Sequence, residues 1–171
     1  MEHLQEDINR AMYGDFADML PAADYSFSKV FDKAKGCAAY TFCMCPGGYV
    51  INASLEPDGT VTNGMSYHAR DGRNANSAML ASVSFNSPQK GLDFQRKLEQ
   101  TAFRLGNGSA PASLLKDYLN GEISKSFGHI KPTFLPGTEF CDFNTLFPKS
   151  VSDMLKTGLT EFGKRIYSDG Q

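Results

Sequence analysis

Strand-like segments fill the first half of this chain and helix-like segments fill the second half. Runs of β-branched, aromatic and small apolar residues, bounded by turn residues, mark strands at residues 38–44, 49–54, 60–62 and 79–85. Strands followed by helices predict an α+β fold, in which a mainly antiparallel sheet from the N-terminal half is covered on one face by helices from the C-terminal half. The alternating strand and helix order of a Rossmann domain is absent from the sequence.

Apolar residues at helical spacing predict the helices. They are expected at residues 4–12, from Ser87–Pro88 to Gly106, at 113–119, and from Pro148 to Ile166. A serine cap followed by proline starts the second helix, and Gly106 ends it. The segment from Gly14 to Phe31, after the first helix, is expected to be irregular, and residues 121–147 are expected to form a loop.

Length and charge limit the classes of protein that this chain can belong to. With 171 residues the chain is expected to form one domain: 1–36 leads into the sheet, 37–86 holds the sheet with a polar loop, and 87–171 is mainly helical. The net charge of -2 gives no field that attracts nucleic acid or anionic membranes. No apolar run reaches the ~20 residues of a spanning helix, and no signal peptide is visible, so we expect a cytoplasmic protein.

One polar run stands out between the strand signals. Residues 63–77 contain almost no large aliphatic side chain and are rich in Gly, Asn, Ser, His, Arg and Asp. We therefore expect a loop there, not a core strand or a core helix. Long polar loops held between regular elements of a compact domain usually bind something or are disordered, and the flanking strand signals argue against disorder.

The residues of this run suggest chemistry as well as plain loop structure. His68 can transfer a proton near neutral pH, and Arg70 can form paired hydrogen bonds to a carboxylate, phosphate or carbonyl oxygen. The amides of Asn74 and Asn76 can donate and accept at once. A solvated loop with asparagine-rich turns fits the same residues, and Asn63–Gly64 is also typical of a hairpin turn.

The glycines that precede this run also allow two interpretations. Pro46, Gly47 and Gly48 leave the main chain uncovered, so a flat or phosphorylated ligand can approach it closely. A tight turn between two strands explains the same three residues.

Four cysteines, at positions 37, 43, 45 and 141, are interpreted as thiols because no secretion signal is present. Cys43 and Cys45 are expected on one face of a strand, as small buried residues. A zinc site is the alternative interpretation, in which His68 and Cys141 would complete the four-ligand set with Cys43 and Cys45. No second paired motif supports it, and we expect no metal.

Three motifs resemble the middle of bacterial FAD-dependent dehydrogenases. They are Cys-Met-Cys-Pro-Gly-Gly-Tyr-Val at 43–50, Val-Thr-Asn-Gly-Met-Ser at 61–66, and Ala-Arg-Asp-Gly-Arg-Asn-Ala-Asn-Ser-Ala at 69–78. The resemblance extends over nearly the whole chain. Two glycine-rich stretches of such flavoproteins, the nucleotide-binding fingerprint and the one that reaches the flavin, are missing from this sequence.

The resemblance implies an internal domain, a substrate or cap domain excised from its FAD-binding Rossmann domain. Such a domain is implied to form one wall of the flavin and substrate site and to be inactive alone. FAD is expected in the full-length protein and not on this fragment. The implied partners are the missing FAD-binding domain and a small-molecule substrate. An inserted domain needs neighbouring ends, so residues 2–4 are expected beside 167–170.

The resemblance also assigns roles to residues. His68 is implied to be an acid or base, and Arg70 is implied to hold an anionic or carbonyl group. Residues implied to face the cofactor or the substrate are Cys45, Pro46, Gly47, Gly48, Asn63, Gly64, Met65, Ser66, Asn74 and Asn76. A stand-alone module that binds a small ligand or a protein through residues 63–77 is the alternative function.

Overall fold

The computed structural model describes residues 1–34 and 36–167, and its contacts divide the chain into two compact units. Unit 1 comprises residues 1–50, residues 64–82 and the chain from Asp153 onward. Unit 2 comprises residues 51–63 and 83–152. The assignment of residues 1–171 to a single substrate domain stays a prediction.

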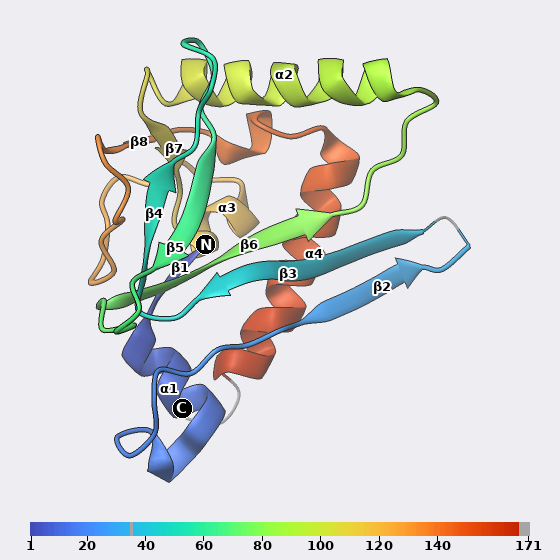
Figure 1. Cartoon of the computed structure of the whole chain (residues 1–171). Helices are drawn as coiled ribbons and strands as arrows, with labels where there is room; N and C mark the ends of the chain where they lie inside the picture. Colours follow the sequence, from blue (N-terminus) through green and yellow to red (C-terminus); the bar gives the residue numbers. More distant parts are fainter. Residues whose placement is uncertain (35, 168–171) are drawn as a thin grey trace. The chain divides into compact units, whose positions relative to one another are not determined.

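A four-stranded antiparallel sheet forms the centre of unit 1 (Figure 1). Its strands, in spatial order, are β1 (Glu2–Leu4), β6 (Asn74–Ala81), β3 (Cys37–Cys45) and β2 (Ser28–Asp32). Neighbouring strands pair antiparallel throughout. The predicted α+β class and the antiparallel sheet from the N-terminal half are confirmed.

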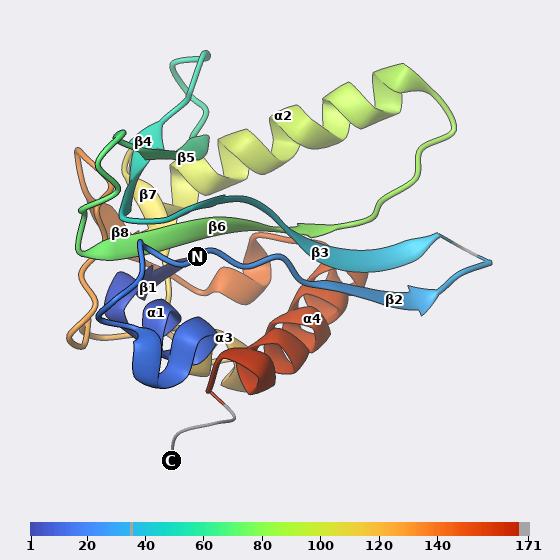
Figure 2. The same cartoon turned by 60° about the horizontal axis from the view of Figure 1, so that its bottom comes forward.

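Two helices cover the same face of this sheet (Figure 2). They are α1 (Gln5–Tyr13) and the unit 1 portion of α4 (Lys149–Tyr167). Ile8 of α1 is fully buried, and it shares one cluster with Phe162 and Ile166 of α4 and with Ala75 of β6. Large apolar side chains removed from water each contribute about 1.5–3 kcal/mol. This cluster therefore fixes the face of β6 that points toward the helices.

Unit 2 is built mainly from helix α2 (Pro88–Leu105), which begins as the sequence predicts. The Ser87 side chain accepts a hydrogen bond from the backbone N–H of Lys90, and Pro88 occupies the first turn. The other elements of unit 2 are β7 (Ala110–Ala112), α3 (Leu115–Asn120), β8 (Thr138–Phe140) and the 3-10 turn η2 (Phe143–Thr145). Strand β8 lies in the predicted loop because its three residues pair with the distant β7 and carry no local pattern.

The predicted loop at residues 63–77 is largely wrong. Asn63 and its next three residues belong to β5 (Thr62–Ser66), which pairs with β4 (Gly48–Asn52), and Asn74 begins β6. Residues 74–77 are all buried. The apolar pattern did not reveal the start of β6, because Asn74, Asn76 and Ser77 are polar residues that are buried in the fold, and only Ala75 between them packs in the apolar cluster.

Two strands of the sheet also lie in segments where no strand was expected. Strand β1 is a three-residue start before α1, and β2 lies in the segment predicted to be irregular. A 3-10 turn, η1 (Gly14–Phe16), follows α1. Edge strands that are short and half exposed give weak periodic signals.

None of the helices in the described part of the chain is long and apolar enough to cross a bilayer. The expected closeness of residues 2–4 to 167–170 depends on residues 168–170, which lie outside the described residues.

A buried histidine makes the stability of unit 1 dependent on pH. His3 Nε2 lies 2.9 Å from the Tyr25 hydroxyl, and both residues are buried. Burial, with a smaller contribution from the N-terminal ammonium group, lowers the pKa of His3 to about 4. An unfolded histidine takes up its proton near pH 6.5, whereas folded His3 stays neutral, so acid favours the unfolded state.

We therefore expect the free energy of unfolding to fall by about 3 kcal/mol between pH 7 and pH 4. Denaturant unfolding across this range measures the loss, and an NMR titration of the imidazole gives the pKa directly. The His3→Asn variant identifies the NMR signal and should lack this part of the pH dependence. A His3 midpoint near 6.5 would contradict the prediction.

Candidate functional site

An exposed loop over residues 67–73 joins β5 to β6 in unit 1. Tyr67, His68 and Arg70 are all exposed on it. The backbone N–H of Arg70 donates to the Tyr67 carbonyl oxygen, and Arg70 has a φ of 52°. A non-glycine residue in this left-handed conformation is uncommon and indicates a loop held in one shape. Both residues that were predicted to be catalytic therefore lie on one short turn.

The loop is fastened to the Pro46–Gly48 turn by direct backbone packing. The backbone N–H of Gly72 donates to the Gly47 carbonyl oxygen at 3.2 Å. Gly47 has a φ of 51°, and a Cβ built on it would overlap the carbonyl group of Arg70. A Cβ on Gly72 would likewise overlap the Gly47 backbone. Only glycine permits this contact at either position.

A buried glutamine ties both segments to the start of the chain. The Gln5 side-chain oxygen accepts from the backbone N–H of Gly47 at 2.7 Å, and the Gln5 backbone N–H donates to the Arg73 carbonyl oxygen. The Gln5 amide nitrogen donates to the Ala23 carbonyl oxygen and to the Asn9 side chain. Sequence reasoning missed Gln5, because its partners are far from it in the sequence. We call Gln5, Gly47 and Gly72 the glycine clamp.

A second glycine contact lies directly beside the clamp. The Asn76 side-chain oxygen and the Cys45 sulfur both pack against Gly64, in the space that a Cβ would fill. Asn76 pairs with Cys45 across β6 and β3 and is 3% exposed. Its side-chain nitrogen has no hydrogen-bond partner among the described residues. A buried N–H without a partner costs free energy, about 1–3 kcal/mol, and so calls for an explanation.

The residues predicted to face the cofactor or the substrate differ in burial. Asn63 is exposed and belongs to unit 2. Cys45, Gly64, Met65 and Ser66 are half-buried, and the buried residues are Pro46, Gly47, Gly48, Asn74 and Asn76. The Ser66 hydroxyl donates to the Pro46 carbonyl oxygen at 2.6 Å. The Asn74 side chain donates to the Glu2 carboxylate at 3.2 Å.

The Pro46–Gly48 segment is a tight turn between β3 and β4, as one of the two interpretations predicted. The space above its glycines holds the backbone of residues 65 and 70. This turn is therefore covered by the chain itself on the sides where Cβ atoms would point.

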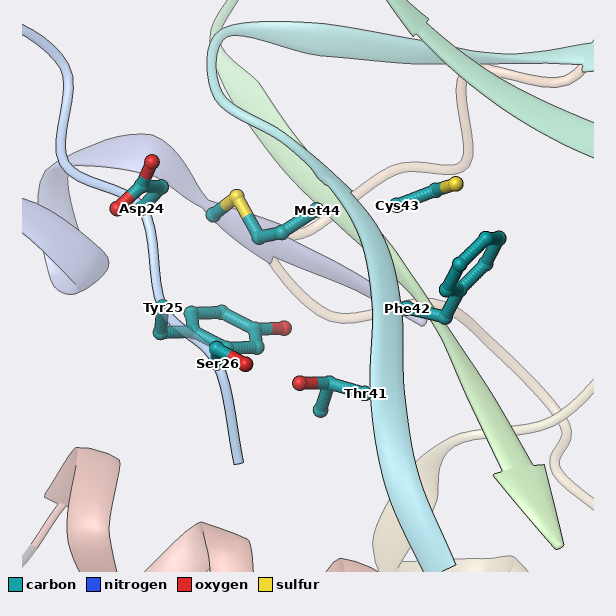
Figure 3. Close-up of a pocket in the computed structure, with 7 residues that line it drawn as sticks. All are labelled: Asp24, Tyr25, Ser26, Thr41, Phe42, Cys43 and Met44. Atoms are coloured by element: carbon teal, nitrogen blue, oxygen red, sulfur yellow. The ribbon is translucent and has the colours of Figure 1, made fainter. Parts of the chain in front are cut away.

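A pocket of about 370 Å³ opens where the segment 24–26 diverges from β3 (Figure 3). Thr41 and Met44 face that segment, whereas Phe42 and Cys43 project to the other side of the strand (Figure 3). Asp24 contributes a carboxylate at the rim. No sequence signal marked this pocket, because the separation of the two segments is a tertiary feature.

The cysteines are free thiols, and Cys43 corrects an expectation. Cys43 is exposed, not buried, and it lies in a bulge where the pairing of β3 with β6 shifts register between Phe42 and Cys45. Burial, then the nearby Cys43, raises the pKa of the Cys45 thiol. No group of three or more His, Cys, Asp or Glu side chains within residues 1–34 and 36–167 is arranged to hold a metal ion. The zinc interpretation gains no support from this arrangement.

The chain belongs to the family described as "FAD-dependent protein, C-terminal domain-like", which matches residues 1–169. An uncharacterized protein of Clostridium beijerinckii is 42% identical over 175 residues, a stretch that covers 97% of this chain. The chain spans about a third of the length of that relative (33%). The resemblance to FAD-dependent proteins is thereby confirmed at the level of the family.

The packing in the glycine clamp predicts that a single methyl group added at Gly47 strongly lowers stability. Replacing Gly47 by alanine should lower the free energy of unfolding of unit 1 by more than about 2 kcal/mol, because the new Cβ meets the Arg70 backbone at a positive φ. Urea denaturation of the two proteins measures the difference.

Gly163→Ala is the matched control, because it also adds a methyl group to unit 1. Gly163 lies within α4, and no heavy atom lies within 4 Å of an added Cβ there. Its free energy of unfolding should stay level or rise by up to about 1 kcal/mol. Similar losses in both variants would show that the clamp is not the cause.

Proposed function

We propose that this chain forms one wall of the flavin and substrate site of an FAD-dependent oxidoreductase of the dehydrogenase type. The family match over residues 1–169 carries the proposal. In this proposal the chain is a substrate or cap domain, inserted into or joined to an FAD-binding domain of the same polypeptide, and does not carry out the flavin-dependent reaction alone. The greater length of the Clostridium beijerinckii relative agrees with further domains.

The residues of unit 1 fit a flavin at the 67–73 loop better than at the glycine turn. A ligand on the turn would have to displace the chain's own backbone from Gly47 and Gly48. The exposed side chains of His68 and Arg70 have no such obstacle. In the proposal the glycines allow the close packing, and the loop they hold contacts the ligand.

The flavin, when bound, supplies the electron-transfer chemistry, and the protein supplies orientation and electrostatics. The Arg70 guanidinium binds an anionic or carbonyl oxygen through paired hydrogen bonds. His68, two residues away on the same turn, gives or takes a proton at its imidazole nitrogen. The half-buried Ser66 and Met65 border the loop at the end of β5.

The hydrogen bonds that hold the 67–73 loop favour a ligand-binding role for it over that of a plain solvated loop. Positioning groups act well only when they are held in place before the ligand arrives. The clamp holds the end of the loop that enters β6, through Gly72 to Gly47 and through Arg73 to Gln5. At the other end, the Ser66 hydroxyl donates to the Pro46 carbonyl oxygen. The alternative, a stand-alone module that binds through residues 63–77, keeps Asn63 and the 67–73 loop as its exposed part.

Arg70→Ala tests the proposed site in the complete polypeptide that contains this chain. We expect the complete protein to carry FAD, and we expect the variant to bind FAD about tenfold more weakly or to show a shifted visible flavin spectrum. A lost charge-assisted hydrogen bond has this magnitude. FAD titration of the apoprotein and the absorption spectrum measure both effects.

Arg104→Ala serves as the control, since Arg104 is exposed on α2 and donates to the Thr101 hydroxyl. This variant should bind FAD like the unaltered protein. A complete protein without flavin affinity would reject the proposed function. Normal FAD binding, spectrum and flavin reduction in Arg70→Ala would reject only the role of Arg70.

A further inference from the structure

Cys43 and Cys45 are two free thiols in a distorted end of strand β3. The pairing with β6 is regular up to Phe42, then skips to Cys45, so the bulge contains Cys43 and Met44. Cys43 has a φ of 47°, a conformation that costs a non-glycine residue free energy. Bulges re-aim side chains and occur often next to active sites.

The bulge brings the Cys45 sulfur back toward Cys43. The Cys45 sulfur lies 3.3 Å from the Cys43 carbonyl oxygen, as a donor to it. Residues two apart in the chain have Cα atoms no more than about 7 Å apart. A disulfide usually needs a Cα separation of about 4.4–6.8 Å. Closing a bond between the two sulfurs therefore needs only local movement of the bulge.

The two thiols differ in their surroundings in the way that an attacking and a resolving thiol differ. Cys43 is exposed and projects, with the 55% exposed Phe42, to the side of β3 that faces away from Tyr25 (Figure 3). A small molecule can thus approach Cys43 freely.

Cys45 is half-buried, and its pKa is raised, first by burial and then by the neighbouring Cys43. Ser66 acts in the opposite direction, as a hydrogen-bond partner that lowers the pKa of Cys45. Asn76, the cross-strand partner of Cys45, packs on the same glycine and has a buried amide nitrogen without a partner among the described residues.

We propose that Cys43 and Cys45 are a dithiol–disulfide couple that reduces small organic disulfides. The Cys43 thiolate attacks one sulfur of the disulfide, forms a mixed disulfide and releases one thiolate, which takes up a proton. Cys45 then loses its proton and attacks the Cys43 sulfur, which forms the Cys43–Cys45 disulfide and releases the second thiolate. The two protein thiols are oxidised, and the organic disulfide is reduced to two thiols.

This activity needs no flavin and stands apart from the proposed function. The probe is 2-hydroxyethyl disulfide, added to the reduced 171-residue chain. After an acid quench, alkylation and mass spectrometry of peptides, we expect an internal disulfide on the peptide that carries both cysteines. Its mass should be lower by two hydrogen atoms, with little mixed disulfide remaining.

The Cys45→Ser and Cys45→Ala variants should instead retain the mixed disulfide at Cys43, at a level at least about tenfold above that of the unaltered chain. The Cys43→Ser variant should react at least about tenfold more slowly at Cys45. Cys37→Ser and Cys141→Ser are the controls and should still form the internal disulfide. Circular dichroism verifies that each variant is folded.

Two results would overturn the proposal. One is a mixed disulfide at Cys43 that persists equally with and without Cys45. The other is a native chain in which Cys43 stays reduced while Cys37 or Cys141 reacts. Neither result bears on the affinity of the complete protein for FAD, so this test and the Arg70 test fail independently.

Discussion

The contact between the Gly47 turn and the backbone of residues 70–72 is the constraint on which the candidate site depends. Two hydrogen bonds meet at Gly47: its N–H donates to Gln5, and its carbonyl oxygen accepts from Gly72. Both glycines exclude any Cβ at this contact. The loop that carries His68 and Arg70 is therefore positioned by main chain packed on main chain. Hydrophobic burial acts separately, where Ile8 and Phe162 pack in the cluster between the sheet and its helices.

Successive residues of strand β6 belong to these two environments in turn. Ala75 faces the apolar cluster under the sheet, whereas Asn76 faces the cysteine and glycine contact above it. Side chains of a strand alternate between its faces, so one strand supports the core and the site at once. This dual role explains how a polar sequence stays buried. Among the described residues, the Asn76 amide nitrogen is the one fully buried side-chain nitrogen or oxygen atom without a hydrogen-bond partner.

Several features of the fold were readable from sequence because their causes are local. Ser87 and Pro88 mark the start of α2, and Gly121 ends α3 in the left-handed conformation. Strand β3 follows from an uncharged run, and the Pro46–Gly48 turn follows from its residue types. Among site residues, exposure of His68 and Arg70 follows from a polar segment that contains Gly72.

The sequence alone determined the α+β class, the main helices and the membership of residues 1–169 in a family of FAD-dependent proteins. Tertiary structure decided that Gly47 is covered by backbone and is not open to a ligand, because Gly47 meets residues 70–72 only after folding. It also decided that Asn74 and Asn76 lie in a buried strand, and that Gln5 serves the site. The physical reason is that these roles depend on hydrogen-bond partners and packing neighbours far away in the sequence.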